Sequence, residues 1–236
     1  MTYGEGIDAA LLAELRRHDT PTICNALEIA TGGRRATGFT RRTMTAPFPT
    51  LPPIVGFART ATLRSAAQSS MDAAQARELR LAYYEHVAAA DCPTVVVIQD
   101  LDHDVGLGAF WGEVNSKVHR ALGCAGVVTN GAVRDLDVLA PDFPIIAGCV
   151  TPSHAFVRIE SIGGDVDILG MQVADGDLIH ADRHGAVRIE REAAPRLPHA
   201  IAVIVAREKL ILDAAAQPGF GVDAIRRAMA DGDDIH

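Results

Sequence analysis

The sequence predicts an α/β fold with a mostly parallel central sheet, and three observations lead to this prediction. The middle of the chain alternates strand and helix patterns, with strands expected at 94–100, 125–131 and 145–150 and helices at 109–123 and 132–140. The run TVVVIQD, residues 94–100, is apolar and β-branched, which is typical of a strand buried on both faces. After Thr151, short alternating runs broken by glycine and aspartate predict small antiparallel strands and hairpins.

The flanking segments are expected to be helical at both ends of the chain. Residues 7–17 have apolar side chains at helical spacing, and a second helix is expected to start with Thr20 as N-cap and Pro21 at its first position. Gly32 and Gly33 should end it. The segments in between and beyond are expected to be a loop at 34–53, a strand at 56–64, a helix at 71–90 and one or two closing helices from 193.

Composition limits the class of protein. The 236 residues suit one domain, 1–236, with an N-terminal helical arm at about 1–33 and a C-terminal helical segment at about 191–236. The net charge of -8 argues against nucleic acid as the main partner, and no apolar run approaches the roughly 20 residues that span a bilayer. Four cysteines without a C-x-x-C pair indicate reduced, mostly buried thiols in a cytoplasmic protein.

Charged side chains follow the expected strand at 125–131. Ligands of open α/β sheets bind beyond the carboxyl ends of the strands, which selects the loops after Asp100, Thr129 and Val150. Arg134 offers a planar fork for a carboxylate or an oxyanion, and the neighbouring Asp135 offers a hard oxygen for a divalent cation. With Glu113, these side chains predict Mg²⁺-assisted chemistry on a small oxo-acid; a surface ion pair is the alternative.

Three other motifs allow a functional and a structural interpretation. The glycines of GLGAFWGE, residues 106–113, could bring backbone amides at a helix start close to an anion, or simply make a flexible loop. Asp102, His103 and Asp104 could form a metal cluster, although an exposed polar loop explains them better. The segment 175–185, with His180, Asp182 and His184, has the same ambiguity, and turn chemistry is favoured there.

Three sequence blocks together resemble the RraA-like family. They are WGE at 111–113, G-x-V-x-x-G-x-V-R-D at 126–135 and GD-x-x-x-AD-x-x-G at 176–185, and the similarity extends over about 20–190. The family includes class II 4-hydroxy-4-methyl-2-oxoglutarate / 4-carboxy-4-hydroxy-2-oxoadipate aldolases and the ribonuclease E regulator proteins. The resemblance implies an α-β-β-α sandwich, a homotrimer or hexamer, and a site between subunits.

The resemblance also implies roles for individual residues. Asp135 would hold Mg²⁺ or Mn²⁺, Glu113 would reach the metal directly or through water, and Arg134 would bind the oxo-acid and stabilise the enolate. The backbone amides of Val114 and Asn115 would hold the substrate carboxylate. The family usually has Asp at the positions of Asn130, which is expected to bind substrate, and of Asn25. Glu208 is the candidate for the acidic residue that a neighbouring subunit would contribute.

The expected reaction is cleavage of a 4-hydroxy-2-oxo acid to pyruvate, with oxaloacetate decarboxylation as a companion activity, because both produce the same enolate. A Schiff-base aldolase is the chemical rival and needs a desolvated lysine. The chain has two lysines, of which Lys117 is expected to pair with Glu113 one helical turn away, while Lys209 lies among other charges. The alternative from another class is a non-enzymatic regulator that binds ribonuclease E or a similar protein.

Overall fold

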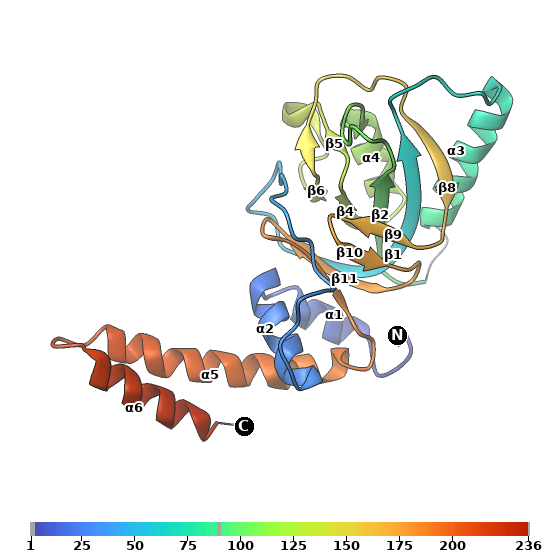
Figure 1. Ribbon diagram of the computed structural model, residues 1–236. Coiled ribbons are helices and arrows are strands. Elements are labelled where there is room, and N and C mark those ends of the chain that lie inside the picture. Colours follow the sequence, from blue (N-terminus) through green and yellow to red (C-terminus); the bar gives the residue numbers. More distant parts are fainter. Residues whose placement is uncertain (1–2, 89–90, 236) are drawn as a thin grey trace.

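A seven-stranded mixed sheet forms the centre of the computed structural model, which describes residues 3–88 and 91–235 (Figure 1). Its parallel part consists of β1 (Ile54–Arg64), β2 (Thr94–Asp100), β4 (Cys124–Thr129) and β6 (Ile145–Ile146). Antiparallel strands complete it on the other side of β1, namely β8 (Arg158–Ile162), β11 (Leu178–Asp182) and β12 (Gly185–Ile189). The predicted α/β class is therefore confirmed, with parallel strands where the β-branched runs were expected.

Strand β1 gives the sheet its curl. Its first half, 54–57, pairs with β11, and its second half, 61–64, pairs with β8, so one long strand serves two different neighbours along the same edge. Figure 1 shows β1 curving through the molecule between these partners. The side chains of β2 alternate between opposite faces: Val95 and Val97 pack in one buried cluster, and Val96 and Ile98 pack in another. This two-sided burial is the reason why the run at 94–100 is continuously apolar.

A second, small parallel sheet continues the first. It consists of β3 (Ala109–Trp111), β5 (Ala132–Val133) and β7 (Cys149–Val150), which follow β2, β4 and β6 in the chain and keep their order. Three expectations were wrong here: 109–111 is a strand rather than the start of a helix, 132–133 is a strand, and 145–150 is two strands. Ala109, Phe110 and Trp111 are all buried, so pairing and packing outweigh the helical pattern that follows them.

The helices begin at recognisable caps. Asp8 caps α1 (Ala9–Leu15), and Asp19 rather than Thr20 caps α2 (Thr20–Thr31), accepting from the Thr22 amide at 2.9 Å. Gly32 ends α2 in the left-handed conformation, as predicted. The remaining α-helices are α3 (Ala73–Ala88), α4 (Glu113–Ala121), α5 (Leu197–Ala215) and α6 (Val222–Asp233). The helix expected at 71–90 is thus shorter, and residues 89 and 90 lie outside the described residues.

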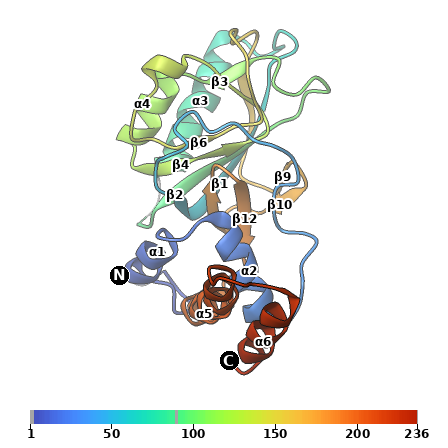
Figure 2. The same cartoon turned by 90° about the vertical axis from the view of Figure 1, so that its left-hand side faces the viewer.

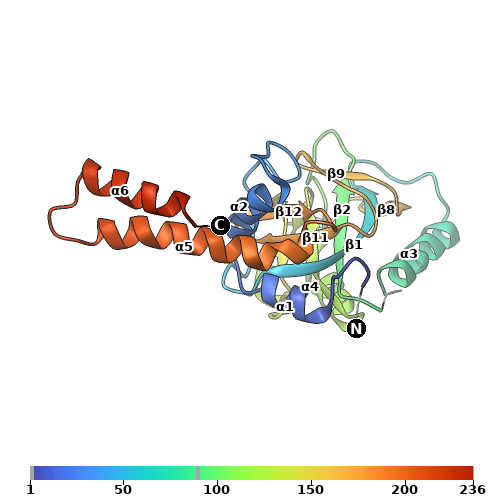
Figure 3. The same ribbon diagram turned by 90° about the horizontal axis from the view of Figure 1, so that it is seen from below.

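The helices gather at two ends of the molecule. Helices α1, α2 and α5 pack with β11 and β12 at one end, while α3 and α4 lie at the other end with the small sheet (Figures 1 and 2). Between them, the β-hairpin of β9 (Val166–Ile168) and β10 (Met171–Val173) closes a third buried cluster. Helix α5 extends away from the body and α6 folds back along it (Figure 3). No helix of the described chain has the length and apolarity needed to cross a bilayer.

Candidate functional site

The candidate site lies where β3 and β5 end side by side. Trp111 is in register with Val133, and the amide of Arg134 donates to the Trp111 carbonyl at 2.8 Å. The next residues on the two strands, Gly112 and Arg134, therefore lie next to each other. Because β3 and β5 are parallel, the site is at the carboxyl end of the small sheet. The sequence analysis placed Arg134 and Asp135 directly after the strand that is now β4, whereas the short strand β5 lies between β4 and these residues.

Asp135 lies at the amino end of α4. Its Oδ2 atom accepts a hydrogen bond from the Glu113 amide at 3.2 Å and lies 3.6 Å from Nε of Arg134. The N-cap residue of α4, Gly112, has no side chain, so this carboxylate from the neighbouring strand takes the capping position. Both charged side chains are about one-third exposed, at 33% for Arg134 and 35% for Asp135, which leaves them accessible to a ligand.

The backbone of Asp135 is unusual. Its φ of 57° places it in the left-handed region, which Asp and Asn adopt more readily than other non-glycine residues. This conformation starts the short 3₁₀ helix η1 (Leu136–Val138), where the sequence predicted a regular helix over 132–140. The turn points the carboxylate back toward α4 instead of along a helix surface.

Gly112 leaves the space that the Asp135 carboxylate occupies. A Cβ atom at position 112 would lie 2.5 Å from Oδ2 of Asp135 and 3.2 Å from Cγ and Nε of Arg134. The φ of Gly112 is -158°, an extended value open to any residue, so glycine is required here for space and not for backbone freedom. The glycine of the WGE block therefore serves the site directly.

Two backbone amides at the start of α4 are free to bind an anion. The amides of Val114 and Asn115 belong to the first turn, and no side chain in the described chain accepts a hydrogen bond from either. The Asn115 side chain is occupied: its Nδ2 donates to the Phe110 carbonyl at 2.6 Å, and its Oδ1 accepts from Tyr84 at 3.0 Å. Asn115 can thus offer its amide, while its side chain fixes α4.

A buried aromatic cluster holds α4 against the strands. The His119 ring lies 4.6 Å from the Trp111 ring, centroid to centroid, and its Nε2 is 2.8 Å from the Tyr83 hydroxyl. Burial lowers the pKa of His119 to about 4, only partly opposed by its hydrogen bond to the Asn115 carbonyl. His119 is therefore neutral at pH 7, and its contacts with Trp111 and Tyr83 fix the position of α4.

Glu113 is paired within its own helix. Its carboxylate lies 2.5 Å from Nζ of Lys117, and both side chains are about half exposed. No three His, Cys, Asp or Glu side chains within residues 3–88 and 91–235 lie close enough to form a metal site. A cation on Asp135 would therefore take most of its oxygen ligands from water, substrate or another subunit. Mg²⁺ is commonly bound in this way, because it keeps several water ligands and needs only one or two protein carboxylates.

The structure places the other predicted positions apart from this pair. The Asn130 side chain is buried and joins the ends of β2 and β4: its Oδ1 accepts from the Asp100 amide at 2.7 Å, and its Nδ2 donates to the Asp100 carbonyl at 3.0 Å. Asn25 is exposed on α2, and Glu208 is exposed on α5, at the opposite end of the molecule from α4 (Figure 1). Glu208 could therefore approach such a site only in another copy of the chain.

The remaining motifs have structural roles. Gly106 packs against Cys149 and Gly108 packs against Ser65, and neither begins a helix; among the glycines of 106–113, Gly112 lies at a helix start, as the N-cap of α4. Asp102 accepts from the amides of Ser65 and Ala66, and these bonds lower its pKa against the opposing effect of burial. His180 is fully buried against Thr20, with its pKa lowered to about 4 by burial.

The cysteines also differ from expectation. All four are free thiols, as predicted, but Cys124 alone among them is buried, and the other three are partly exposed. Burial raises the pKa of each thiol, to about 11 for Cys24. The thiol form therefore dominates at neutral pH, and none is an activated nucleophile.

The fold and this site define an α/β protein that presents a guanidinium, a carboxylate and free amides at one helix start. A family model described as RraA-like, Aldolase/RraA, matches residues 20–188, so the chain belongs to the RraA-like family. This confirms the resemblance carried by the three sequence blocks.

Individual proteins share only limited sequence identity with this chain. An uncharacterized protein of Methanocaldococcus jannaschii, MJ0644, is 34% identical over 91 residues, which cover 38% of this chain and 44% of that protein. A crystal structure of an uncharacterized protein from Pseudomonas syringae pv. tomato has a TM-score of 0.68 at 20% identity, covering 95% of both chains.

A third similar protein has a regulatory description. RraAS2 of Streptomyces coelicolor, an unusual member of the RNase ES inhibitor RraA protein family, has a TM-score of 0.64 at 22% identity. The likeness covers 89% of this chain and 98% of that one. At 20% and 22% identity, these solved structures show the fold alone.

Proposed function

We propose that the protein is a divalent-metal-dependent aldolase or lyase that cleaves a 4-hydroxy-2-oxo acid to pyruvate through the pyruvate enolate. The observation that supports this most is the position of Arg134 and Asp135 at the start of α4, beside two free amides. Decarboxylation of oxaloacetate is a companion activity in this proposal, since it produces the same enolate.

The proposed roles follow from the chemistry of these groups. The amides of Val114 and Asn115, at the positive end of α4, bind the substrate carboxylate. Arg134 donates to the 2-oxygen, where negative charge grows as the C–C bond breaks. Mg²⁺ or Mn²⁺ held by Asp135 would act as a Lewis acid for that oxygen and lower the pKa of bound water. Glu113 follows Gly112 at the start of α4, and its amide already contacts Asp135. If its carboxylate left Lys117, it would reach the cation directly or through a water molecule.

The lysines argue against the Schiff-base rival. Lys117 pairs with Glu113 and its side chain is 54% exposed, while Lys209 lies 2.6 Å from Asp213 and is 68% exposed. A Schiff-base lysine needs a lowered pKa, which desolvation or a cationic neighbour provides. Neither lysine has such surroundings, and the sequence contains no third one.

A site shared between subunits is part of the proposal. Apolar side chains surround the candidate site in an exposed position, and Val114 is 70%, Val138 48% and Leu136 39% exposed. Burying these side chains against another copy would exclude water from the reacting atoms. In a homotrimer or hexamer, a neighbouring copy would cover these exposed apolar side chains and bring its Glu208 to the site.

The test is pyruvate release from 4-hydroxy-4-methyl-2-oxoglutarate and from oxaloacetate, followed by coupled reduction of the pyruvate. Activity with Mg²⁺ should disappear with EDTA and return with Mg²⁺ or Mn²⁺. The Asp135→Asn variant should be inactive, whereas Asp137→Asn, a matched change on the exposed turn beside it, should keep full activity. Full pyruvate release in EDTA would exclude the proposed chemistry.

The second candidate function is a non-enzymatic regulator that binds ribonuclease E or a similar protein. The observation that favours it is the fold similarity to RraAS2, although 22% identity carries only the fold. Capture of ribonuclease E by the protein, together with no pyruvate release for any tested 4-hydroxy-2-oxo acid, would favour this function. The two measurements separate the two classes.

A further inference from the structure

A separate polar cavity of about 850 Å³ lies at the carboxyl ends of β2 and β4, beside the β9–β10 hairpin. Strand ends of this kind are the usual ligand position in α/β sheets, and the volume is in the range of small-molecule sites. The segments 41–42, 99–105 and 167–170 form its walls, and the residues that matter for its chemistry are Arg41, Arg42, Gln99, Asp100, His103 and Asn130.

The floor of the cavity is rigid. Asp100 is 1% and Asn130 is 8% exposed, and their backbone and amide groups are joined by two hydrogen bonds. The Asp100 carboxylate accepts from the Asp102 amide at 2.9 Å and from the Gly106 amide at 2.8 Å, which fixes the loop over 101–108. Each carboxylate oxygen thus accepts one hydrogen bond and has the capacity for a second, and Asp100 is among the residues that line the cavity.

The walls carry hydrogen-bond donors that have no acceptor. Within residues 3–88 and 91–235, the side chains of Arg41 and Arg42 make neither an ion pair nor a hydrogen bond. Gln99 accepts from the Asp167 amide at 2.9 Å through its oxygen, which leaves its NH₂ group to donate. Two further carboxylates line the cavity, and both already accept hydrogen bonds: Asp102 from the Ser65 and Ala66 amides, and Asp167 from the Gly170 amide and the Gln172 side chain. The guanidinium groups of Arg41 and Arg42 therefore lack an acceptor within the described chain, and an anionic ligand would supply one.

The position of the Arg41 side chain is fixed by the β9–β10 hairpin. Its guanidinium lies over Gly170, where an added Cβ atom would come within 2.1 Å of Nε. Gly170 has a φ of +92° in the tight turn of the β9–β10 hairpin, and the amide of Arg41 donates to the carbonyl of the preceding Leu169 at 3.0 Å. The hairpin thus positions the guanidinium at the cavity before any ligand binds.

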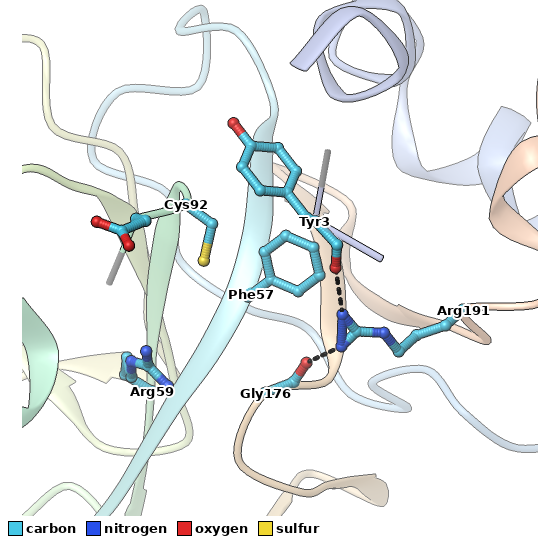
Figure 4. A pocket seen from close by; sticks show the side chains of 7 residues that line it. Tyr3, Phe57, Arg59, Cys92, Gly176 and Arg191 are labelled. Carbon is cyan, nitrogen blue, oxygen red and sulfur yellow. Dashed lines mark hydrogen bonds between the residues drawn. The ribbon is translucent and has the colours of Figure 1, made fainter. Parts of the chain in front are cut away.

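Another cavity, of about 510 Å³, offers an instructive contrast (Figure 4). There Arg191 donates to the carbonyls of Tyr3 and Gly176 and stacks over Phe57 at 4.9 Å, and Arg59 pairs with Asp175 at 3.4 Å. Those guanidinium groups have structural partners in the protein itself. Arg41 and Arg42 have no such partners within the described chain.

We propose that the cavity at Arg41 and Arg42 binds a small hydroxylated anion, a hydroxy acid or its phosphorylated counterpart. The guanidinium groups bind the anionic oxygens, Gln99 donates a further hydrogen bond, and Asp100 accepts from a hydroxyl group of the ligand. This site is separate from Arg134 and Asp135 and does not depend on the proposed lyase activity.

The test is calorimetric titration of the full chain with malate, succinate and inorganic phosphate as probes. Malate should bind more tightly than succinate, which lacks the hydroxyl, and tight phosphate binding would identify the phosphorylated class. Arg41→Ala/Arg42→Ala should weaken malate binding about tenfold or more, and the matched change Arg183→Ala, on the exposed β11–β12 turn, should not. Binding should persist in Arg134→Gln.

Three results would overturn the inference. They are unchanged malate affinity in the double variant, loss of malate binding in Arg134→Gln, and a change of molecular mass in solution caused by the double variant. The last result would mean that Arg41 and Arg42 contact another copy of the chain instead of a small molecule. Far-ultraviolet circular dichroism of the double variant provides the folding control.

Discussion

The change Gly112→Ala tests the geometry of the candidate site without removing any of its functional groups. The new methyl carbon would lie 2.5 Å from Oδ2 of Asp135, and an ordinary contact is at least 3.4 Å. The carboxylate must therefore move by roughly 0.9 Å, the difference between 2.5 and 3.4 Å. Arg134, at 3.2 Å, has to give by a few tenths of an ångström.

A displacement of about 1 Å at reacting groups can cost about 100-fold in rate, equivalent to about 2.7 kcal/mol in the activation free energy. We therefore expect kcat/KM for pyruvate release to fall about 100-fold in Gly112→Ala. The free energy of unfolding should fall by only about 1 kcal/mol, because the main loss is the hydrogen bond from the Glu113 amide that caps α4. Coupled pyruvate assays and urea unfolding measure the two quantities.

The matched control is Gly33→Ala, because a Cβ atom at Gly33 meets nothing within 4 Å and its backbone needs no positive φ. Its activity should equal that of the unmodified protein. Wild-type kcat/KM in a folded Gly112→Ala protein would refute the assignment of Asp135 to the reaction, since its carboxylate would have moved without consequence.

Four further predictions use other residues. Asp135→Asn keeps the left-handed turn but loses the charge, so it should stay folded and lose Mn²⁺ binding measured by electron paramagnetic resonance. Arg134→Lys loses the planar fork and should lower kcat/KM for pyruvate release at least tenfold; an unchanged value would remove Arg134 from the mechanism. Borohydride with pyruvate should give no covalent adduct on Lys117, and mass spectrometry would reveal one if the Schiff-base route operated. His119 and His180 have pKa values lowered to about 4 from 6.5, so the unfolded chain binds protons first as pH falls. Stability should be full above pH 6.5 and decline between pH 6.5 and 4, by a few kcal/mol in urea unfolding; a flat profile would contradict their burial as neutral groups.

Much of the fold was predictable because its signals are local. The strand at 94–100 was predicted with its observed bounds, since burial on both faces requires a continuous apolar run. The end of α2 followed from Gly32, which adopts the left-handed conformation there. The pairing of Lys117 with Glu113 also followed from helical spacing.

The small sheet could not be predicted from local pattern. Its strands contain two or three residues, and the short run at 132–133 looks like the start of a helix until the neighbouring strand is known. The left-handed Asp135 depends on this pairing, because the turn has to bring the carboxylate back to α4. Asp is one of the few non-glycine residues that favours such a turn, but sequence alone did not select it.

The cavity at Arg41 and Arg42 was missed for a different reason. The two arginines lie in the long segment 34–53, which sequence analysis assigned correctly to a loop but to no site. Their place beside Asp100 depends on the β9–β10 hairpin, whose residues are more than 120 positions further along the chain. Adjacent arginines in a segment without any acidic residue were the available signal.

The most direct test of the central claim is a crystal structure of the protein with Mg²⁺ and oxalate, which resembles the pyruvate enolate in shape and charge. We expect the cation on Asp135 and the oxalate between that cation, Arg134 and the amides of Val114 and Asn115. Crystals that bind neither, with Asp135 still paired to Arg134 and capping α4 as it does here, would contradict the proposed function.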